Sequence, residues 1–266
     1  MSGDMKAVGD STDRAASAQC GPRWGDDPPI ASFSNPVPKR ALGGRDLVTG
    51  SLEPRREPSW QVGDPVKTRR VFSYVVVHDT GFSPNPFHGV LTLACCKPLI
   101  RKTAKVGDLI VGMSSRSERI VYATQVAEVI SFDEYWADPR YQARRPNMTA
   151  REIVYRAGDN IYEPVTGGYR QLPSFHSNPD GSEDAALKST DLSSKRVLVG
   201  ERFTYWGRSG PALPQELLFL AVGRGHRCNF TNDQIDVVAR WFAGLPGGVL
   251  GAPAQWKVGD LSWCEA

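Results

Sequence analysis

Residues 119–130, with the sequence RIVYATQVAEVI, make up the longest β-like segment of the chain. In an extended chain, positions 120, 122, 124, 126 and 128 point to one face and positions 121, 123, 125, 127 and 129 to the other. Valine, isoleucine, tyrosine and threonine are common in the segment, and these residues fit a pleated strand. We therefore expect one long strand over 119–130.

Four further segments predict strands, and four short segments predict helices. The strands are 71–78 (VFSYVVVH), 90–94 (VLTLA), 108–113 (DLIVGM) and 196–205 (RVLVGERFTY). Helix starts are indicated by capping-box pairs at 131/134, 149/152 and 231/234, and by a proline at 214. Because strands and helices do not alternate regularly, we expect an α+β domain: a small curled sheet or β-barrel with flanking short helices.

The composition changes near residue 68. Residues 1–68 hold eight of the 20 prolines and only three of the 25 aromatic residues. Such a segment buries too little apolar surface to offset the entropy of ordering, so 1–68 is predicted to be a disordered leader. Residues 69–266 are predicted to form a single α+β domain, with a long irregular insertion at 163–194.

Several protein classes are excluded by simple features of the sequence. No apolar run approaches the about 20 residues of a membrane span, and the N-terminus carries acids where a secretory signal is apolar. Five cysteines, two of them adjacent, do not indicate a secreted disulfide scaffold, so a cytoplasmic location is expected. The net charge of +3 is too small to mark a nucleic-acid binder by itself.

The segment 78–112 concentrates reactive residue types where a predicted strand ends. Cys95 or Cys96 could act as a nucleophile, because nearby cations favour the reactive thiolate. Asp79 follows the strand and opens a Gly/Pro/Asn loop, a usual place for functional side chains. The partner base stays open among four histidines: His78, His88, His176 and His226. For an enzyme, the expected catalytic residues are Asp79, Cys95, Cys96 and His226.

Two other motifs in the chain are weaker. Residues 79–81 (DTG) match the aspartic-protease triplet, but such enzymes need two carboxylates and the chain has a single triplet. A zinc site could use Cys95, Cys96, His226 and Cys228. Adjacent cysteines on a strand point to opposite faces, however, so one ion rarely uses both. We therefore predict no metal and no cofactor.

Three basic clusters are interleaved with aromatic residues, at 97–105, 135–156 and 224–227. Arginines contact phosphates and aromatic rings stack on exposed bases. The alternative is a solvated surface over buried rings. Because the net charge is low and the basic residues are clustered locally, the expected ligand is a nucleotide or a short single strand and not long duplex DNA.

The motifs DTGF, ACCKP, VGD and GRGHR occur in that order, together with VLVGERFTYWG. In this combination the chain resembles the nucleotide-modification-associated domain 2 family over roughly residues 70–230. The resemblance implies a role near modified nucleotides, in DNA base-modification systems of phages and bacteria, and possible partner proteins from such a system.

The order of strand, loop, KVGD turn and strand is also similar to EVE and PUA-like barrels, which bind a flipped and often modified base. That likeness implies a pocket near Asp108, Gly112, Tyr122 and Gln125, with Tyr135 or Trp136 free to stack. The leading hypothesis is recognition of a modified base or nucleotide, single-stranded or flipped. The alternative is an enzyme with a cysteine nucleophile and Asp79 or His226 as acid/base. The expected ligand-binding residues are His78, Asn85, Arg101, Asp108, Tyr122, Gln125, Trp136, Arg144, Arg145, His176, Arg224 and Arg227.

Overall fold

The structure is a computed structural model that describes residues 60–68 and 70–257. Most of the predicted leader, residues 1–59, lies outside the described residues, as do residue 69 and residues 258–266. In the described part of the chain, no helix is long and apolar enough to cross a membrane.

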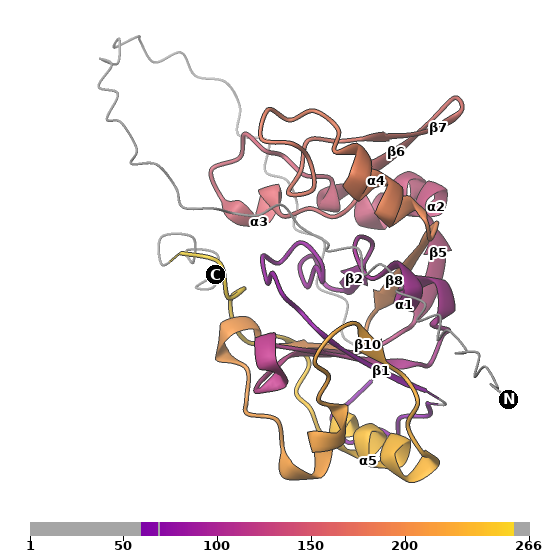
Figure 1. Cartoon of the computed structure of the whole chain (residues 1–266), viewed down its shortest axis with the longest axis vertical. Helices are drawn as coiled ribbons and strands as arrows, with labels where there is room; N and C mark the ends of the chain where they lie inside the picture. Colours follow the sequence, from indigo (N-terminus) through magenta and orange to yellow (C-terminus); the bar gives the residue numbers. More distant parts are fainter. Residues whose placement is uncertain (1–59, 69, 258–266) are drawn as a thin grey trace, which may run out of the picture. The chain divides into compact units, whose positions relative to one another are not determined.

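Two sheets form the centre of the fold (Figure 1). The first has six strands in the order β10 (His226–Arg227), β1 (Val71–Val75), β3 (Leu109–Met113), β4 (Ile120–Gln125), β9 (Phe203–Tyr205) and β11 (Gly248–Val249). The second has three strands in the order β2 (Leu91–Leu93), β8 (Arg196–Gly200) and β5 (Glu128–Ser131). A separate hairpin consists of β6 (Tyr162–Val165) and β7 (Gly168–Gln171).

Two predicted strands each contribute to both sheets. The segment 119–130 forms β4 in the first sheet and β5 in the second, so the prediction of one continuous strand is wrong. The segment 196–205 divides in the same way into β8 and β9. The two bends lie against each other: the Gln125 N–H donates to the Arg202 carbonyl at 3.0 Å. Gly200 is required there, since a Cβ would lie 1.9 Å from the Thr124 hydroxyl.

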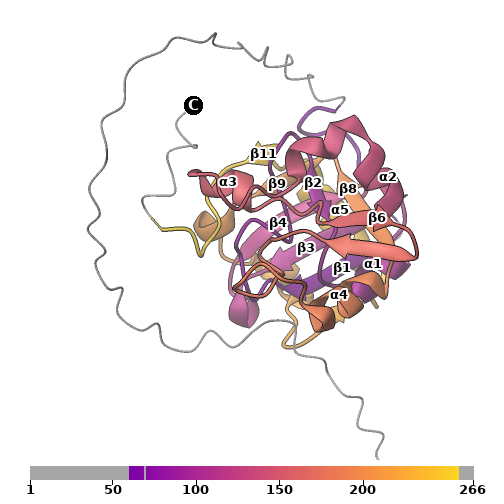
Figure 2. The same ribbon diagram turned by 90° about the horizontal axis from the view of Figure 1, so that it is seen from above.

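Two helices cover the outer faces of the two sheets (Figures 1 and 2). Helix α5 (Asn232–Ala243) packs Ile235, Val238 and Phe242 on the first sheet. Helix α2 (Phe132–Ala137) packs Phe132 and Tyr135 on the outer side of the second sheet. Between the sheets lies a core that includes Phe72, Tyr74, Leu93, Tyr122, Leu198 and Tyr205.

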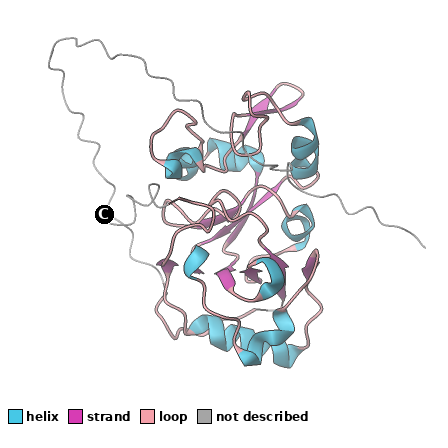
Figure 3. Cartoon of the chain, turned by 60° about the vertical axis from the view of Figure 1, so that its left-hand side comes forward, coloured by secondary structure: helices cyan, strands magenta, loops and turns pink. Residues whose placement is uncertain are grey.

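The predicted capping boxes of α2 and α5 are confirmed: Ser131 pairs with Glu134, and Thr231 with Gln234. The cap predicted at Thr149 is wrong, because helix α3 (Ile153–Arg156) starts after Glu152. The other α-helices are α1 (Pro98–Thr103) and α4 (Ala185–Leu192). Short 3₁₀ segments complete the fold: Ser115–Ser117, Pro139–Arg144, Gly207–Ser209 and Gln215–Leu220. Figure 3 shows the helices and strands of the chain in separate colours.

The α+β class with short flanking helices is confirmed, and strands that change sheets curl the structure. Within the described residues the larger sheet stays open, with β10 and β11 at its edges, so it is not a closed barrel. Residues 163–194 are more regular than the sequence indicated, because they contain most of the β6–β7 hairpin and all of α4. The described end of the predicted leader contacts the domain, with the Arg202 guanidinium 4.8 Å from the Trp60 ring centroid.

Candidate functional site

The adjacent cysteines lie in a sharp turn between β2 and α1. Cys96 and Lys97 both have left-handed backbones, with φ values of 57° and 40°. This conformation is unfavourable for residues other than glycine, at about 1–2 kcal/mol each, and such residues cluster at functional sites. The turn ends the alternation of the strand, so Cys95 is buried whereas Cys96 is half-buried.

Cys96 is in contact with a histidine–aspartate pair from a distant segment. The Sγ atom lies 3.4 Å from Nε2 of His176, and Nδ1 of the same ring lies 2.9 Å from Oδ2 of Asp191. The His176 side chain is 12% exposed and that of Asp191 only 1%. Thiol, imidazole and carboxylate thus form a line that runs from the edge of the site into the interior.

Three groups besides His176 hold the Asp191 carboxylate. It accepts hydrogen bonds from the Cys96 N–H at 2.6 Å and the Tyr162 hydroxyl at 2.9 Å. Arg101 Nη2 lies 4.0 Å from Oδ1, the oxygen that accepts from the Cys96 N–H. Burial alone would raise the pKa of Asp191, but the hydrogen bond to His176 and the charges of His176 and Arg101 hold it below its usual range.

An ionised Asp191 can only accept hydrogen bonds, so Nδ1 of His176 carries the proton. In the neutral form of the ring, Nε2 is then an acceptor directed at the Cys96 thiol. The Phe82 ring lies 4.6 Å from the His176 ring and supports this orientation. The arrangement is that of a thiol, a base and a group that orients the base.

Arg101 connects the two halves of the site. Its Nε donates to the Cys96 carbonyl at 2.8 Å, and its Nη2 donates to the Asp191 carbonyl at 2.5 Å. The guanidinium is fully buried. Arg101, predicted to contact phosphate, therefore acts inside the protein as a clamp on the two chain segments.

Cys95 has a different environment from Cys96. Burial, followed by the charges of Asp191 and Asp159, raises the pKa of its thiol well above the ordinary value. Cys95, His176 and Asp191 nevertheless place one potential metal-ligand atom each within 4.8 Å of one another. These are the residues of the site that could hold a metal, although the buried thiol would first have to ionise.

Asp79 lies near the site but is bonded elsewhere. Its carboxylate accepts from the Tyr205 hydroxyl and from the Ala254 N–H. Burial raises its pKa, against the effect of these hydrogen bonds. Burial, followed by the interaction with Tyr122, raises the pKa of Tyr74, and the charges of Cys96 and Asp79 add to this rise.

A second buried network contains two more of the predicted residues. Arg144 is fully buried, lies 3.8 Å from Asp159 and donates to Asn85 Oδ1 at 3.0 Å. Asn85 also donates to the Ala157 carbonyl at 2.9 Å. Both side chains face protein atoms, not solvent.

The residues expected around a base pocket are not gathered at Cys96. Tyr122 is fully buried and shares a 2.9 Å hydrogen bond with Tyr74. Gln125 donates to two carbonyls at 3.2 Å, and Asp108 pairs with Arg70 at 2.6 Å. The ring of Trp136 is covered by Arg145, whose guanidinium lies 3.9 Å from the ring centroid.

The remaining predicted residues lie at the surface or on β10. His78 is exposed and lies 3.4 Å from the Gln255 amide. Arg224 is exposed, and Arg227 donates to the Phe219 carbonyl at 2.9 Å. His226 is half-buried and pairs with Tyr74 across the β1–β10 ladder.

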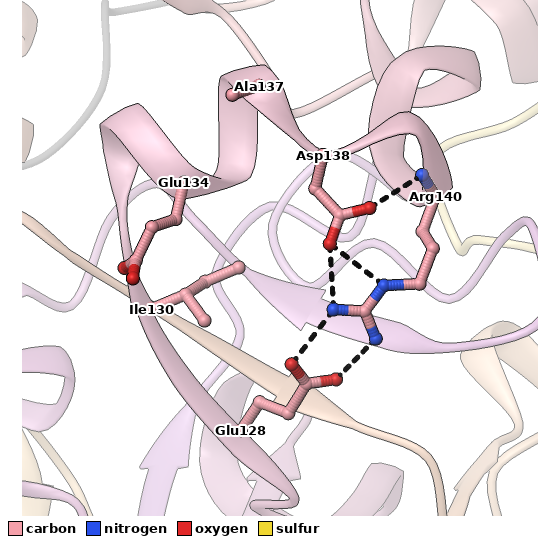
Figure 4. Close-up of a pocket in the computed structure, with 6 residues that line it drawn as sticks. All are labelled: Glu128, Ile130, Glu134, Ala137, Asp138 and Arg140. Carbon is pink, nitrogen blue, oxygen red and sulfur yellow. Dashed lines mark hydrogen bonds and ion pairs between the residues drawn. The ribbon is translucent and has the colours of Figure 1, made fainter.

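A surface hollow of about 500 Å³ lies away from these groups (Figure 4). It is lined by Glu128, Ile130, Glu134, Ala137, Asp138 and Arg140. Arg140 is already paired with two of the carboxylates, Glu128 at 2.7 Å and Asp138 at 2.8 Å. None of Cys96, His176 and Asp191 lines this hollow, so we assign no chemistry to it.

Sequence reasoning named Cys96 and His176 but missed Asp191, Tyr162 and Phe82. Asp191 lies on α4, in a segment that was expected to be irregular. The signal that could have directed attention to it is the length of the 163–194 insertion, because long loops in compact domains are usually functional.

One comparison with known proteins gives a match. The model of the family described as nucleotide modification associated domain 2 matches residues 68–260, well over half of the chain, and confirms the predicted resemblance. The matched range includes Cys96, His176 and Asp191. No curated protein and no solved structure matches the chain.

Proposed function

The chain belongs to the nucleotide modification associated domain 2 family, and from that premise we propose that it is a cysteine-dependent enzyme acting on a modified base or nucleotide. Cys96 is the nucleophile, His176 the base, and Asp191 orients the imidazole. The observation that carries the proposal is the line of contacts from Cys96 to His176 at 3.4 Å and on to Asp191 at 2.9 Å.

The reaction type that fits these groups is acyl transfer or hydrolysis. Nε2 of His176 accepts the thiol proton, and the thiolate attacks the carbonyl carbon of an acyl or amide group on the nucleotide. The tetrahedral adduct expels the leaving group, which takes the proton from His176, and a thioester remains on Cys96. Water then attacks the thioester with His176 as base, which releases the acid and restores the thiol.

Recognition of a modified base or nucleotide, free or flipped from a strand, is part of this proposal, since an enzyme must bind the group it modifies. Asp79 and His226 are not given the role of acid/base, because His176 is the group in contact with Cys96. Stacking of a base on Trp136 would require Arg145 to leave the ring. If Cys96 is unreactive, the alternative is a domain that binds the nucleotide without modifying it.

The test uses p-nitrophenyl acetate, a general acyl donor, on the full chain. We expect a burst of about one p-nitrophenolate per chain and an acetyl group on Cys96 in peptide mass spectrometry. Cys96→Ala should abolish the burst, whereas Cys95→Ala is the matched control and should retain it. Absence of a burst in the folded wild-type protein, with and without a chelator to remove bound metal, would contradict the proposal.

A further inference from the structure

Lys97 and His226 both lie next to Tyr74, although 129 positions separate them in the sequence. The Lys97 ammonium lies 4.9 Å from the centroid of the Tyr74 ring. His226 is the partner of Tyr74 across the antiparallel β1–β10 pair, so both side chains point to one face of the sheet. The His226 ring also lies 6.2 Å from the Phe72 ring.

In the described part of the chain, neither Lys97 nor His226 has an acidic partner. Farther along the same face, by contrast, Arg70 lies over Phe72 and is paired with Asp108 at 2.6 Å. Both groups are half-buried, and burial and the Lys97 charge lower the pKa of His226. An anion beside them would offset the Lys97 charge and could accept a hydrogen bond from the His226 ring.

The pair is also next to the proposed nucleophile. Lys97 follows Cys96 directly, in the left-handed turn that presents the thiol. β10 is one of the two edge strands of the larger sheet, and His226 on it is only half-buried. A ligand could therefore contact Lys97 and His226 from solvent and extend toward Cys96.

We propose that Lys97 and His226 form a phosphate-binding subsite beside Cys96, and that the substrate carries a nucleotide phosphate. The inference rests on the proposed function for the identity of the neighbouring nucleophile. The ammonium supplies three donors and the imidazole one, which suits the several oxygens of a phosphate. The phosphate belongs either to a free nucleotide or to a nucleic-acid strand.

The test follows the imidazole signals of His226 by NMR in the full chain. Thymidine 5′-monophosphate and inorganic phosphate should shift them saturably, and thymidine should not. Lys97→Gln should weaken the binding by about tenfold or more, as expected for loss of a charge-assisted contact. Lys102→Gln changes the same charge at an exposed position of α1 and should alter the affinity by less than about twofold.

A 5′-phosphorylated single-stranded oligonucleotide distinguishes the two sources, because tighter binding than the mononucleotide assigns the phosphate to a strand. Equal affinity of wild type and Lys97→Gln, or no His226 shift with either phosphate, would overturn the subsite. Cys96→Ala should still bind the mononucleotide. Phosphate binding without an acyl burst would therefore refute the proposed chemistry alone, and a burst without phosphate binding would refute the subsite alone.

Discussion

Two buried arginine–aspartate networks lie in this fold, and they have nearly the same composition. In one, Arg101 lies beside Asp191, which accepts from the Tyr162 hydroxyl at 2.9 Å. In the other, Arg144 lies beside Asp159, which accepts from the Tyr135 hydroxyl at 2.7 Å. All four charged side chains are at most 1% exposed.

The difference between the networks is what the carboxylate faces. Asp159 accepts from Thr92 and Tyr135, and burial raises its pKa against the charge of Arg144. Asp191 faces His176, and its pKa is lowered instead. Asp191 is the aspartate that an imidazole connects to a half-buried thiol, and the proposed chemistry depends on that connection. The Asp159 network, lacking such a ring, holds the chain together.

The largest effect is expected from Arg144→Met in the structural network. The change leaves Asp159 buried without its cation and removes donors from the Phe87 and Val90 carbonyls. The free energy of unfolding in urea should fall by about 3–5 kcal/mol. Arg140→Met, which removes two ion pairs at the surface, is the control and should cost less than about 1 kcal/mol. Equal losses in the two variants would contradict the structural assignment.

In the reactive network, His176→Gln should slow acetylation of Cys96 by p-nitrophenyl acetate about a hundredfold or more, because it removes the base. The expected change in stability is small beside that of Arg144→Met. His226→Gln is the matched control, since His226 is not the residue in contact with Cys96. A similar loss of rate in both variants would show that the assignment of the base is wrong.

The paired variants Tyr162→Phe and Tyr135→Phe compare the two networks directly. Each removes one hydroxyl that donates to a buried carboxylate, so each should lower the unfolding free energy by about 1–3 kcal/mol. Only Tyr162→Phe should also slow the acetylation of Cys96, because Asp191 is the carboxylate that orients His176. An equal decrease in rate for Tyr135→Phe would remove the distinction between the networks.

The smallest effect is a difference in pH dependence. The lowered pKa of Asp191 stabilises the fold above the unfolded value of about 4, and this stabilisation is lost as the pH falls through the folded pKa. The stability advantage of wild type over Asp191→Asn should therefore shrink in acid. Burial raises the pKa of Asp159, so protonation at low pH removes the free-energy cost of burying its charge. The stability advantage of wild type over Asp159→Asn should therefore grow as the pH falls. Urea titrations between about pH 3 and 7 measure both, and parallel trends would contradict the opposite pKa directions.

Much of the fold could be predicted from local patterns. Strand-like segments located β1, β2 and β3 and the two strands that divide, but not β6, β7, β10 or β11, and two of three capping boxes start helices where expected. The division of 119–130 and 196–205 could not be predicted, because each segment keeps strand-like residues through its bend. Which sheet each half joins is decided by contacts with distant strands, such as the hydrogen bond from Gln125 to Arg202.

The candidate site was predicted only in part, because it too depends on contacts between distant segments. The residues of the 95–97 turn could be recognised locally, but the pairing of Cys96 with His176 spans 80 positions. Arg101 and Arg144 were expected at the surface, where arginines usually lie. Both are buried because backbone carbonyls from separate segments satisfy their guanidinium groups.

The rates at which iodoacetamide alkylates Cys95 and Cys96 in the native protein test the central claim most directly. At a pH of about 6.5, where an ordinary thiol is almost fully protonated, Cys96 should react at least about tenfold faster than a model thiol. Cys95 should remain unmodified until the protein unfolds, and His176→Gln should remove the excess reactivity of Cys96. A Cys96 that reacts no faster than the model thiol, and equally with or without His176, would contradict the account.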